Sequence, residues 1–579
     1  MTPPPFTKKF KSDISALLKR FWPYLVLLGF GLVVVWPWFS QRGFLFLLDF
    51  VSPPQLIRPP APWQAAYLSG LPYRWLAWAM SHFLTTATTL KLLFSLPLFL
   101  AGISMYQLCR HVLRGTADWP ALSALIAGVF YTYSPFVITR VFMGHVFLLY
   151  GYALVPWALL AWIKFQQRAT TRRGLYTSLA LAATVLVSIH YFILAPLLLL
   201  FFLRLPRRKN SQTFLPWLYL ALPVSAVIAF SFILYRYIPF PQLNPVGPWA
   251  RALLAPYSGS YIFDVLNLSA TWKIDLPFLL SWELRPGFGL VSAVLLAVMT
   301  GGFFWMRRLP STRWISYRLI LTIFVGLFLA VGVAQPVTAP VAAWLYQHVP
   351  FWLGLRDSAK FISLIALAES ILLAAGICAL SAVWSRARRK QVTFLAPAIV
   401  SLLVLYLSSA AFYGFGNQLH PLSYPASWQQ AQAWFSANHQ APPRTLFLPW
   451  HMYLPFSFTN YRTIANPARL YFTGADMISG NSNEVGGTFG RPFIYAENTD
   501  ATHQYLQKAL SDSPSRDDFG TRLAPLCIQY VMLATDTLDA ADYNFLYRQK
   551  DLEIVFSQPN LTIWRNKTQA TDQCSPPPS

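Results

Sequence analysis

Residues 119–163, WPALSALIAGVFYTYSPFVITRVFMGHVFLLYGYALVPWALLAWI, contain two apolar runs joined by a short turn. The runs, 119–138 and 146–163, each have about the length that a helix needs to cross a hydrocarbon core roughly 30 Å thick. The whole stretch contains no Lys, Asp or Glu and a single Arg, Arg140, which lies close to the turn. The stretch therefore predicts a helical hairpin that crosses a membrane twice and carries a cation near its tip.

The composition extends this interpretation to most of the chain. Of 579 residues, 55% are hydrophobic and only 11% are charged, whereas a soluble protein has about 25% charged residues. The formal net charge is +24, and the excess of basic residues lies entirely before residue 413. Because this charge belongs to the apolar part of the chain, we expect no nucleic-acid partner. The composition predicts a polytopic α-helical membrane protein with a water-facing C-terminal domain.

Ten apolar runs are candidates for membrane spans. The run at 175–203 is too long for one crossing and short for two. His190 interrupts it, so we interpret it as two short helices that turn at residues 189–191, which gives about eleven crossings. The ten runs are 21–39, 92–109, 119–138, 146–163, 175–203, 214–235, 287–306, 319–334, 362–384 and 392–412.

Basic residues in the short loops indicate the orientation. RRK at 207–209, RR at 307–308 and RARRK at 386–390 fall on one side of the membrane only if 175–203 is a hairpin. Such clusters favour the cytoplasmic side. We therefore expect a multi-pass protein of the plasma membrane, with a cytoplasmic N-terminus and an extracytoplasmic C-terminal domain. The first apolar run is too long for the core of a cleavable signal peptide, so we expect it to remain as an anchor.

The expected organisation has three parts. They are a basic cytoplasmic N-terminus (1–20), a transmembrane domain (21–412) with a long first outer loop at 40–91, and an extracytoplasmic domain (413–579). The last of these has mixed α/β patterns. Residues 428–439 are helix-like, and RTLFLPW, QYVMLAT, LEIVFSQ and LTIWRN are strand-like. Cys527 and Cys574 both fall outside the membrane, where an oxidising setting permits a disulfide between them.

Asp49 is the first candidate for chemistry. It lies in QRGFLFLLDFVSPP, about ten residues beyond the first span and among apolar neighbours. Such surroundings penalise a carboxylate unless it gains cationic or hydrogen-bonding partners. A carboxylate in this position can act as a general base in a cleft at the membrane interface. The alternative is an ion pair with Arg42 or another outer cation.

Arg140 and His145 form the second candidate, at the outer junction of two spans. The arginine fork suits bidentate binding of phosphate, and the glycine beside His145 lets a backbone approach closely. The alternative is an arginine that caps a helix and a histidine that lies in the interface.

The third candidate is VPFWLGLRDSAKFISL, which leads into the apolar run at 362–384. Arg356 and Lys360 place two cations within about one helical turn at the start of a helix, where the helix dipole also favours anions. The alternative is pairing of Arg356 with Asp357 while Lys360 extends to the interface.

Two further titratable residues are supporting candidates. Glu369 falls about two turns inside the run at 362–384, and an acid inside a membrane is a functional candidate by default, although it can simply pair with an arginine or a hydroxyl. His190, at the apex of the short hairpin, has a structural role as its alternative. We expect no cofactor and no bound metal, because the membrane part has no carboxylate cluster, although Asp264 and Asp275 leave a divalent cation open. Motifs for nucleotide binding, zinc proteolysis and serine hydrolysis are missing from the sequence.

The combination of motifs resembles the GT-C class of integral-membrane glycosyltransferases, specifically the YfhO-like and arabinofuranosyltransferase-like bacterial membrane proteins. The resemblance covers most of the chain. The matching segments are LLDF, YSPFVITRVFMGHVFLLYGYALVPW, SIHYF, PFWLGLRDSAKF, YPASW, FLPW and TNYRTIANPAR.

The resemblance implies an enzyme that uses a polyprenyl-phosphate sugar, and no nucleotide sugar, at the outer face of the membrane. Asp49 would deprotonate a hydroxyl of a glycan or glycolipid acceptor. Arg140, His145, Arg356 and Lys360 would hold the lipid phosphate, with His190, Asp357 and Glu369 in support. A single carboxylate base suits one displacement with inversion of configuration.

Two other classes of function compete with this one. A transporter or flippase of polyprenyl-linked sugars should show repeated halves, and the sequence shows no convincing internal repeat. In a non-catalytic membrane assembly protein, Asp49 and Arg356 would merely close the fold. An enzyme requires Asp49, Arg140 and Arg356 or Lys360 to converge, whereas in an assembly protein each would have its own separate partner.

Overall fold

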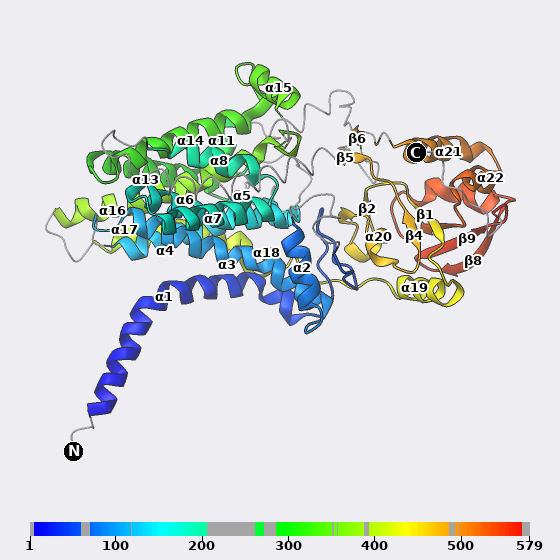
Figure 1. Cartoon of the computed structure of the whole chain (residues 1–579), viewed down its shortest axis with the longest axis horizontal. Helices are drawn as coiled ribbons and strands as arrows, with labels where there is room; N and C mark the ends of the chain where they lie inside the picture. Colours follow the sequence, from blue (N-terminus) through cyan, green and yellow to red (C-terminus); the bar gives the residue numbers. More distant parts are fainter. Residues whose placement is uncertain are drawn as a thin grey trace.

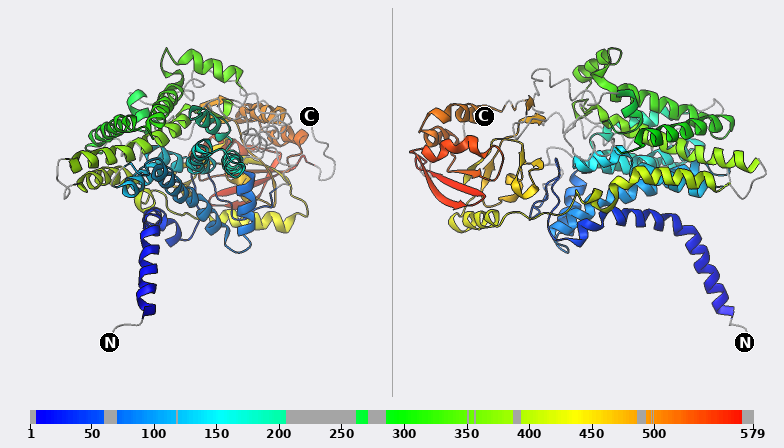
Figure 2. Two further views of the ribbon diagram at one scale, coloured as in Figure 1. Left: turned by 60° about the vertical axis from the view of Figure 1, so that its left-hand side comes forward. Right: turned by 180° about the vertical axis from the view of Figure 1, so that it is seen from behind.

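The computed structural model describes residues 5–59, 70–116, 119–204, 261–270, 285–349, 352–355, 357–386, 393–485, 493–496, 498 and 500–569. A helical bundle forms one part of the elongated molecule, and a domain containing a β-sheet forms the other (Figure 1). The right-hand view of Figure 2 also shows the two parts side by side, and in both views α1 extends away from the bundle toward the N-terminus.

Eight helical segments in the described part are long and apolar enough to cross a membrane, as a polytopic protein requires. The central one is α16, which is buried along its whole apolar length and packs against α13, α14 and α4. The segments are α1 (Pro5–Ser40), α3 (Thr86–Val112), α4 (Pro120–Thr132) continued by α5 (Pro135–Phe142), α6 (Val146–Gln167), α13 (Phe288–Arg308), α14 (Arg313–Val331), α16 (Ile362–Arg386) and α17 (Leu395–Ser408).

Two details refine the predicted spans. The run predicted at 119–138 breaks between α4 and α5, because Pro135 cannot donate the backbone hydrogen bond that would continue the helix. The run predicted at 214–235 lies outside the described residues, so the number of crossings stays a prediction. The shorter helices of this part are α2 (Leu71–Met80), α11 (Tyr261–Leu266), α15 (Ala339–His348), α18 (Phe412–Gly416) and the 3-10 turns η1 (Gly332–Ala334), η2 (Trp352–Leu355), η3 (Ser358–Phe361) and η5 (Ser409–Ala411).

The hairpin predicted around His190 is confirmed. Helix α7 (Thr171–Val187) ends just before this residue, and α8 (Tyr191–Phe201) begins just after it. The start of α8 lies against the first turns of α6, since a Cβ on Gly151 would lie 2.2 Å from the ring of Tyr191. The end of α8 lies beside the end of α6, where Gln166 Nε2 donates to the carbonyl of Phe202 at 2.8 Å.

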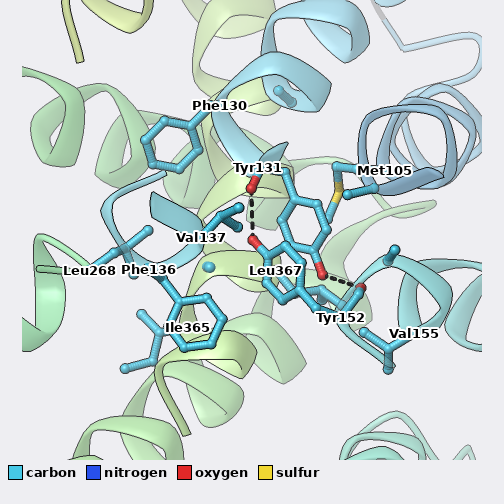
Figure 3. Close-up of a cluster of buried hydrophobic side chains, with 14 of the residues drawn as sticks. Met105, Phe130, Tyr131, Phe136, Val137, Tyr152, Val155, Leu268, Ile365 and Leu367 are labelled. Atoms are coloured by element: carbon cyan, nitrogen blue, oxygen red, sulfur yellow. Dashed lines mark hydrogen bonds between the residues drawn. The ribbon is translucent and has the colours of Figure 1, made fainter. Parts of the chain in front are cut away.

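A pair of tyrosines fixes α4 to α6 (Figure 3). The rings of Tyr131 and Tyr152 stack with centroids 3.9 Å apart. Each phenol donates to the carbonyl of the other residue, at 2.9 and 2.8 Å. Because a buried phenol in an apolar bundle needs an acceptor, these reciprocal bonds hold the two helices in register. They therefore support the segment between the helices, which carries Arg140 and His145.

The C-terminal domain is built on a five-stranded sheet with the order β4-β1-β7-β9-β8. Strand β1 runs parallel to β4 and β7, whereas β9 is antiparallel to both β7 and β8. The four segments predicted to be strands are confirmed, and the helix predicted at 428–439 is α19. The strands are β1 (Arg444–Leu448), β4 (Asp476–Ile478), β7 (Tyr530–Ala534), β8 (Leu552–Gln558) and β9 (Leu561–Asn566).

Each face of this sheet has its own hydrophobic core, because successive side chains of a strand point to opposite faces. Phe447 and Met532 pack on the face covered by α19, and Leu446 and Val531 pack on the other. Cys527 is disulfide-bonded, and Cys574 lies outside the described residues. The remaining elements are α19 (Ala426–Asn438), β2 (Tyr453–Pro455), η6 (Ser457–Thr459), β3 (Thr463–Ala465), α20 (Ala468–Tyr471), β5 (Asn483–Val485), β6 (Phe493–Ala496), α21 (Ala501–Asp512), η7 (Ser513–Ser515), α22 (Phe519–Leu523), η8 (Ala524–Leu526) and η9 (Ala540–Arg548).

Candidate active site

Asp49 lies in a tight turn that follows α1. The turn is closed by the bond from the amide of Leu47 to the carbonyl of Phe50, 2.8 Å long, and the amide of Asp49 donates to the carbonyl of Met143 at 2.9 Å. Gly144 permits this approach, since its φ is +73° and a Cβ there would lie 2.6 Å from the amide nitrogen of Phe50. The glycine beside His145 thus brings the Asp49 turn against the segment between α5 and α6.

Among the described residues, a hydrogen-bond partner lies at each oxygen of the Asp49 carboxylate. His145 Nε2 lies 3.0 Å from Oδ2, and the phenol of Tyr453 donates to Oδ1 at 2.6 Å. The side chain of Asp49 remains 35% exposed. It is therefore held in place and still accessible from outside the protein.

Arg140 is fully buried. One of its terminal nitrogens, Nη1, donates to Asp357 Oδ2 at 2.5 Å and also lies 3.4 Å from His145 Nδ1. The guanidinium also lies over the ring of Phe136, 5.2 Å from its centroid. Among the described residues, its Nε and Nη2 atoms have no hydrogen-bond partner. Since an unpaired buried donor is costly, this guanidinium retains the capacity to bind further oxygen atoms.

The contacts of His145 define its tautomer. A guanidinium can only donate, so Nδ1 accepts from Arg140 and Nε2 carries the proton that is donated to Asp49. Burial lowers the pKa of His145, and the charges of Arg140 and Lys360 lower it further against the opposing effect of Asp49. The imidazole is therefore neutral near pH 7.

Asp357 contacts the same Arg140 nitrogen as His145 does, and the charge of Lys360 acts on both residues. Burial raises the pKa of Asp357, but the charges of Arg140 and Lys360 outweigh this effect, so that the pKa of Asp357 is lowered overall. Asp357 also accepts from the amide of Ala359 at 3.2 Å, which caps η3. Lys360 is 6% exposed, and its ammonium donates to the carbonyl of Gly354 at 2.9 Å.

The structure thus brings together four of the residues predicted from sequence. Asp357, Arg140, His145 and Asp49 form a continuous chain of contacts, with Lys360 adjacent. His190 lies near this group, because a Cβ on Gly354 would be 4.0 Å from its Nδ1.

The other predictions have different outcomes. Asp357 pairs with Arg140, and Arg356, the alternative partner, lies outside the described residues. Glu369 lies deeper in α16, where it is 2% exposed and its Oε1 has no hydrogen-bond partner within the described ranges. In the part of the chain that the structure describes, no group of three His, Cys, Asp or Glu side chains could hold a metal ion.

Tyr453 is the residue that sequence reasoning missed. It comes from β2 of the C-terminal domain and lies 404 positions from Asp49 in the chain. TNYRTIANPAR and FLPW flank this strand in sequence, but neither segment indicates which phenol reaches the membrane part.

Comparison with known proteins gives a fold but no sequence family. No family model and no curated protein matches the sequence. The cryo-EM structure of arabinofuranosyltransferase AftD from Mycobacteria matches with a TM-score of 0.64 at 15% identity, over 94% of this chain and 40% of that chain. The protein has the GT-C fold. A second AftD structure, which carries a point substitution, gives a TM-score of 0.61 at 15% identity, over 94% of this chain and 42% of that one. This GT-C chain thus spans less than half the length of AftD.

Proposed function

We propose that the protein transfers a sugar from a polyprenyl-phosphate donor to a hydroxyl of a cell-surface glycan or lipid, at the extracytoplasmic face of the plasma membrane. The observation that carries this proposal is the convergence of an accessible carboxylate, Asp49, with buried cationic groups, Arg140 and Lys360, through His145. A transferase of this class needs a base for the acceptor and cations for the phosphate that leaves.

Asp49 is the proposed general base. It takes the proton of the acceptor hydroxyl as that oxygen forms a bond to the anomeric carbon, while the bond from this carbon to the phosphate oxygen breaks. The leaving group is already an anion, so it needs positive charge more than it needs a general acid. With one carboxylate base, the reaction proceeds by a single displacement and inverts the anomeric configuration.

His145 orients this base in the proposed mechanism. The resemblance to the family had implied a role for His145 on the lipid phosphate, but its Nε2–H is directed at Asp49. A neutral imidazole donor fixes the carboxylate without neutralising it, so the carboxylate keeps its capacity to accept a proton. Such a positioning role resembles that of orienting groups in other acid–base sites.

Arg140 and Lys360 are the proposed ligands of the donor phosphate. Two nitrogens of Arg140 have no hydrogen-bond partner in the described part of the chain, and Asp357 neutralises part of its charge. Both cationic side chains are at least 94% buried, so a phosphate reaches them only if neighbouring residues move. We expect donor binding to be accompanied by such a rearrangement.

The proposed orientation is supported by the position of the basic loops. The site lies at the start of α6, and Lys164 lies at its other end, where Arg173 donates to its carbonyl. A helix of the 22 residues in α6 is about 33 Å long, which is close to the thickness of the hydrocarbon core. The site and these cationic loops therefore belong to opposite faces of the membrane.

The test uses purified protein in lipid nanodiscs. We expect transfer of a labelled sugar from polyprenyl-phosphate donors extracted from the source membranes, and none from nucleotide sugars. Undecaprenyl phosphate, measured by native mass spectrometry, should bind at least ~10-fold more weakly to Lys360→Gln, because a charge-assisted contact is lost. Lys508→Gln, in exposed α21, should bind as the wild type does.

The same assay separates the competing functions. A flippase would move the lipid without detaching its sugar, and an assembly protein would neither bind undecaprenyl phosphate nor release a sugar. Transfer from a nucleotide sugar would contradict the donor class. Equal binding by wild type and Lys360→Gln would contradict the phosphate site.

A further inference from the structure

The turn that carries Asp49 packs into the C-terminal domain. Phe44 pairs with Leu422 as an antiparallel bridge, and Phe46 is 3% exposed in the core cluster that contains Trp428 and Phe447. The ring of Phe46 lies 4.9 Å from that of Tyr424 and 5.4 Å from that of Phe458, centroid to centroid. In Figures 1 and 2 the blue segment after α1 accordingly lies between the helical bundle and the sheet domain.

Backbone hydrogen bonds continue this contact on both sides of Asp49. The amide of Ala465, in β3, donates to the carbonyl of Leu48 at 2.7 Å. The phenol of Tyr424 donates to the carbonyl of Ser52 at 3.0 Å. The segment 44–52 is therefore held by the C-terminal domain before, within and after the Asp49 turn.

The same turn is also held by the helical bundle. The ring of Phe50 packs on that of Phe94 in α3, with centroids 4.7 Å apart, and the amide of Asp49 bonds to Met143. The carboxylate of Asp49 is likewise bonded from both parts of the molecule. His145 of the bundle and Tyr453 of the C-terminal domain each form a hydrogen bond to it.

The segment that presents Tyr453 is itself well anchored. The amide of Asn466 donates to the carbonyl of Met452 at 2.8 Å, and β2 pairs with β3 directly after this point. One residue earlier, His451 Nε2 lies 3.2 Å from Asp539 Oδ2. The phenol is thus presented to Asp49 by a segment with fixed backbone neighbours.

We propose that Tyr453 of the C-terminal domain is a positioning residue for Asp49, so that the reaction site is complete only when the two parts of the molecule are docked through segment 44–52. A phenol is a far weaker acid than a carboxyl group, so Tyr453 remains the donor and Asp49 remains the ionised acceptor. A hydrogen bond donated to a carboxylate favours its charged form and fixes the direction in which the free lone pairs point. This inference rests on the proposed function, since it assigns a role around the same base.

The first experiment measures Tyr453→Phe in the transfer assay across pH. We expect kcat to fall about 10-fold and the acid limb of the pH profile to move up by about one pH unit, as loss of one hydrogen bond to a charged group implies. The KM for the lipid-linked donor should not change, because Tyr453 is remote from Arg140 in the chain of contacts. Tyr461→Phe, an exposed tyrosine of the same domain, is the matched control and should behave as the wild type does.

The outcomes distinguish this inference from the proposed function. If the wild-type protein transfers no sugar, the proposed function itself is wrong, and if Asp49→Asn retains transfer, Asp49 is not the base. If Asp49→Asn is inactive while Tyr453→Phe keeps the wild-type rate and pH profile, only the positioning role is overturned. A purely structural role for Tyr453 would lower the amount of folded protein and leave the pH profile of the remainder unchanged, which would also overturn the inference.

A second variant tests the docking itself. Phe46→Ala removes the aromatic ring that segment 44–52 inserts into the C-terminal core, so we expect faster hydrogen exchange across 44–52 and a lower kcat. Binding of undecaprenyl phosphate should persist, because Arg140 and Lys360 belong to the bundle. Unchanged exchange together with unchanged kcat would show that docking does not position the base.

Discussion

Asp49 and Asp357 lie at opposite ends of one chain of contacts, but their surroundings differ. The side chain of Asp357 is 8% exposed and pairs with a permanent cation, Arg140. That of Asp49 is 35% exposed, and its bonds among the described residues come from a neutral imidazole and a neutral phenol. A buried carboxylate paired with a cation serves to compensate charge, whereas a partly exposed one with neutral donors keeps the capacity to accept a proton. The environment, and not the residue type, thus separates the structural aspartate from the proposed base.

The largest expected effect on stability is that of Asp357→Asn. This change leaves the fully buried Arg140 without its compensating charge, which costs about 3–5 kcal/mol when one partner of a buried pair is removed. We expect a marked decrease of the unfolding temperature in detergent, which intrinsic fluorescence can measure. Asp49→Asn is the control, and it should unfold close to the wild-type temperature. Equal destabilisation by the two substitutions would contradict the distinction between the two aspartates.

A smaller effect is expected from Gly144→Ala. The left-handed backbone alone costs about 1–2 kcal/mol for a residue with a Cβ, and the new Cβ would also meet the backbone of Phe50. We expect the Asp49 turn to be displaced and transfer to fall at least ~10-fold, since small misplacements of reacting groups are costly. Gly115 is a matched control, because its φ is +74° but a Cβ there meets nothing within 4 Å. If Gly115→Ala and Gly144→Ala lower transfer equally, the close approach of Gly144 to Phe50 does not explain the loss of transfer.

The smallest expected effect is the pH dependence contributed by His145. Because its pKa is lowered in the folded protein, the unfolded chain binds a proton at a higher pH than the folded one does. Stability should therefore decrease as the pH falls below about 6.5, the ordinary histidine value. His145→Gln should lose this part of the pH dependence while it keeps a side-chain donor for Asp49. The unfolding temperatures of both proteins, measured between pH 5 and pH 8, give the difference. If the two temperatures change with pH in the same way, the pKa of His145 is not lowered by folding.

Much of the fold could be predicted from the sequence, because its signals are local. The length and hydrophobicity of the apolar runs predicted the main helices, and the position of His190 predicted the turn between α7 and α8. Alternating apolar residues gave four strands of the sheet. The break before Pro135 was missed because the apolar run continues through it without interruption.

The site was only partly predictable, because its contacts are not local. Asp49 and Arg140 are recognisable as rare charged residues among apolar neighbours. Their partners lie far away in sequence, with 217 positions between Arg140 and Asp357 and 404 between Asp49 and Tyr453. The sequence offered Arg356 only as an alternative partner of Asp357 and did not indicate that folding brings Asp357 to Arg140. The sequence around Tyr453 does not distinguish it from the other tyrosines among the 28 in the chain.

The most direct test of the central claim is the transfer rate of Asp49→Asn, measured in nanodiscs with the lipid-linked donor at saturation. The account predicts a loss of about 10²–10⁴-fold, the usual contribution of a general base, with undecaprenyl phosphate binding and unfolding temperature close to those of the wild type. Transfer by Asp49→Asn at the wild-type rate would contradict it.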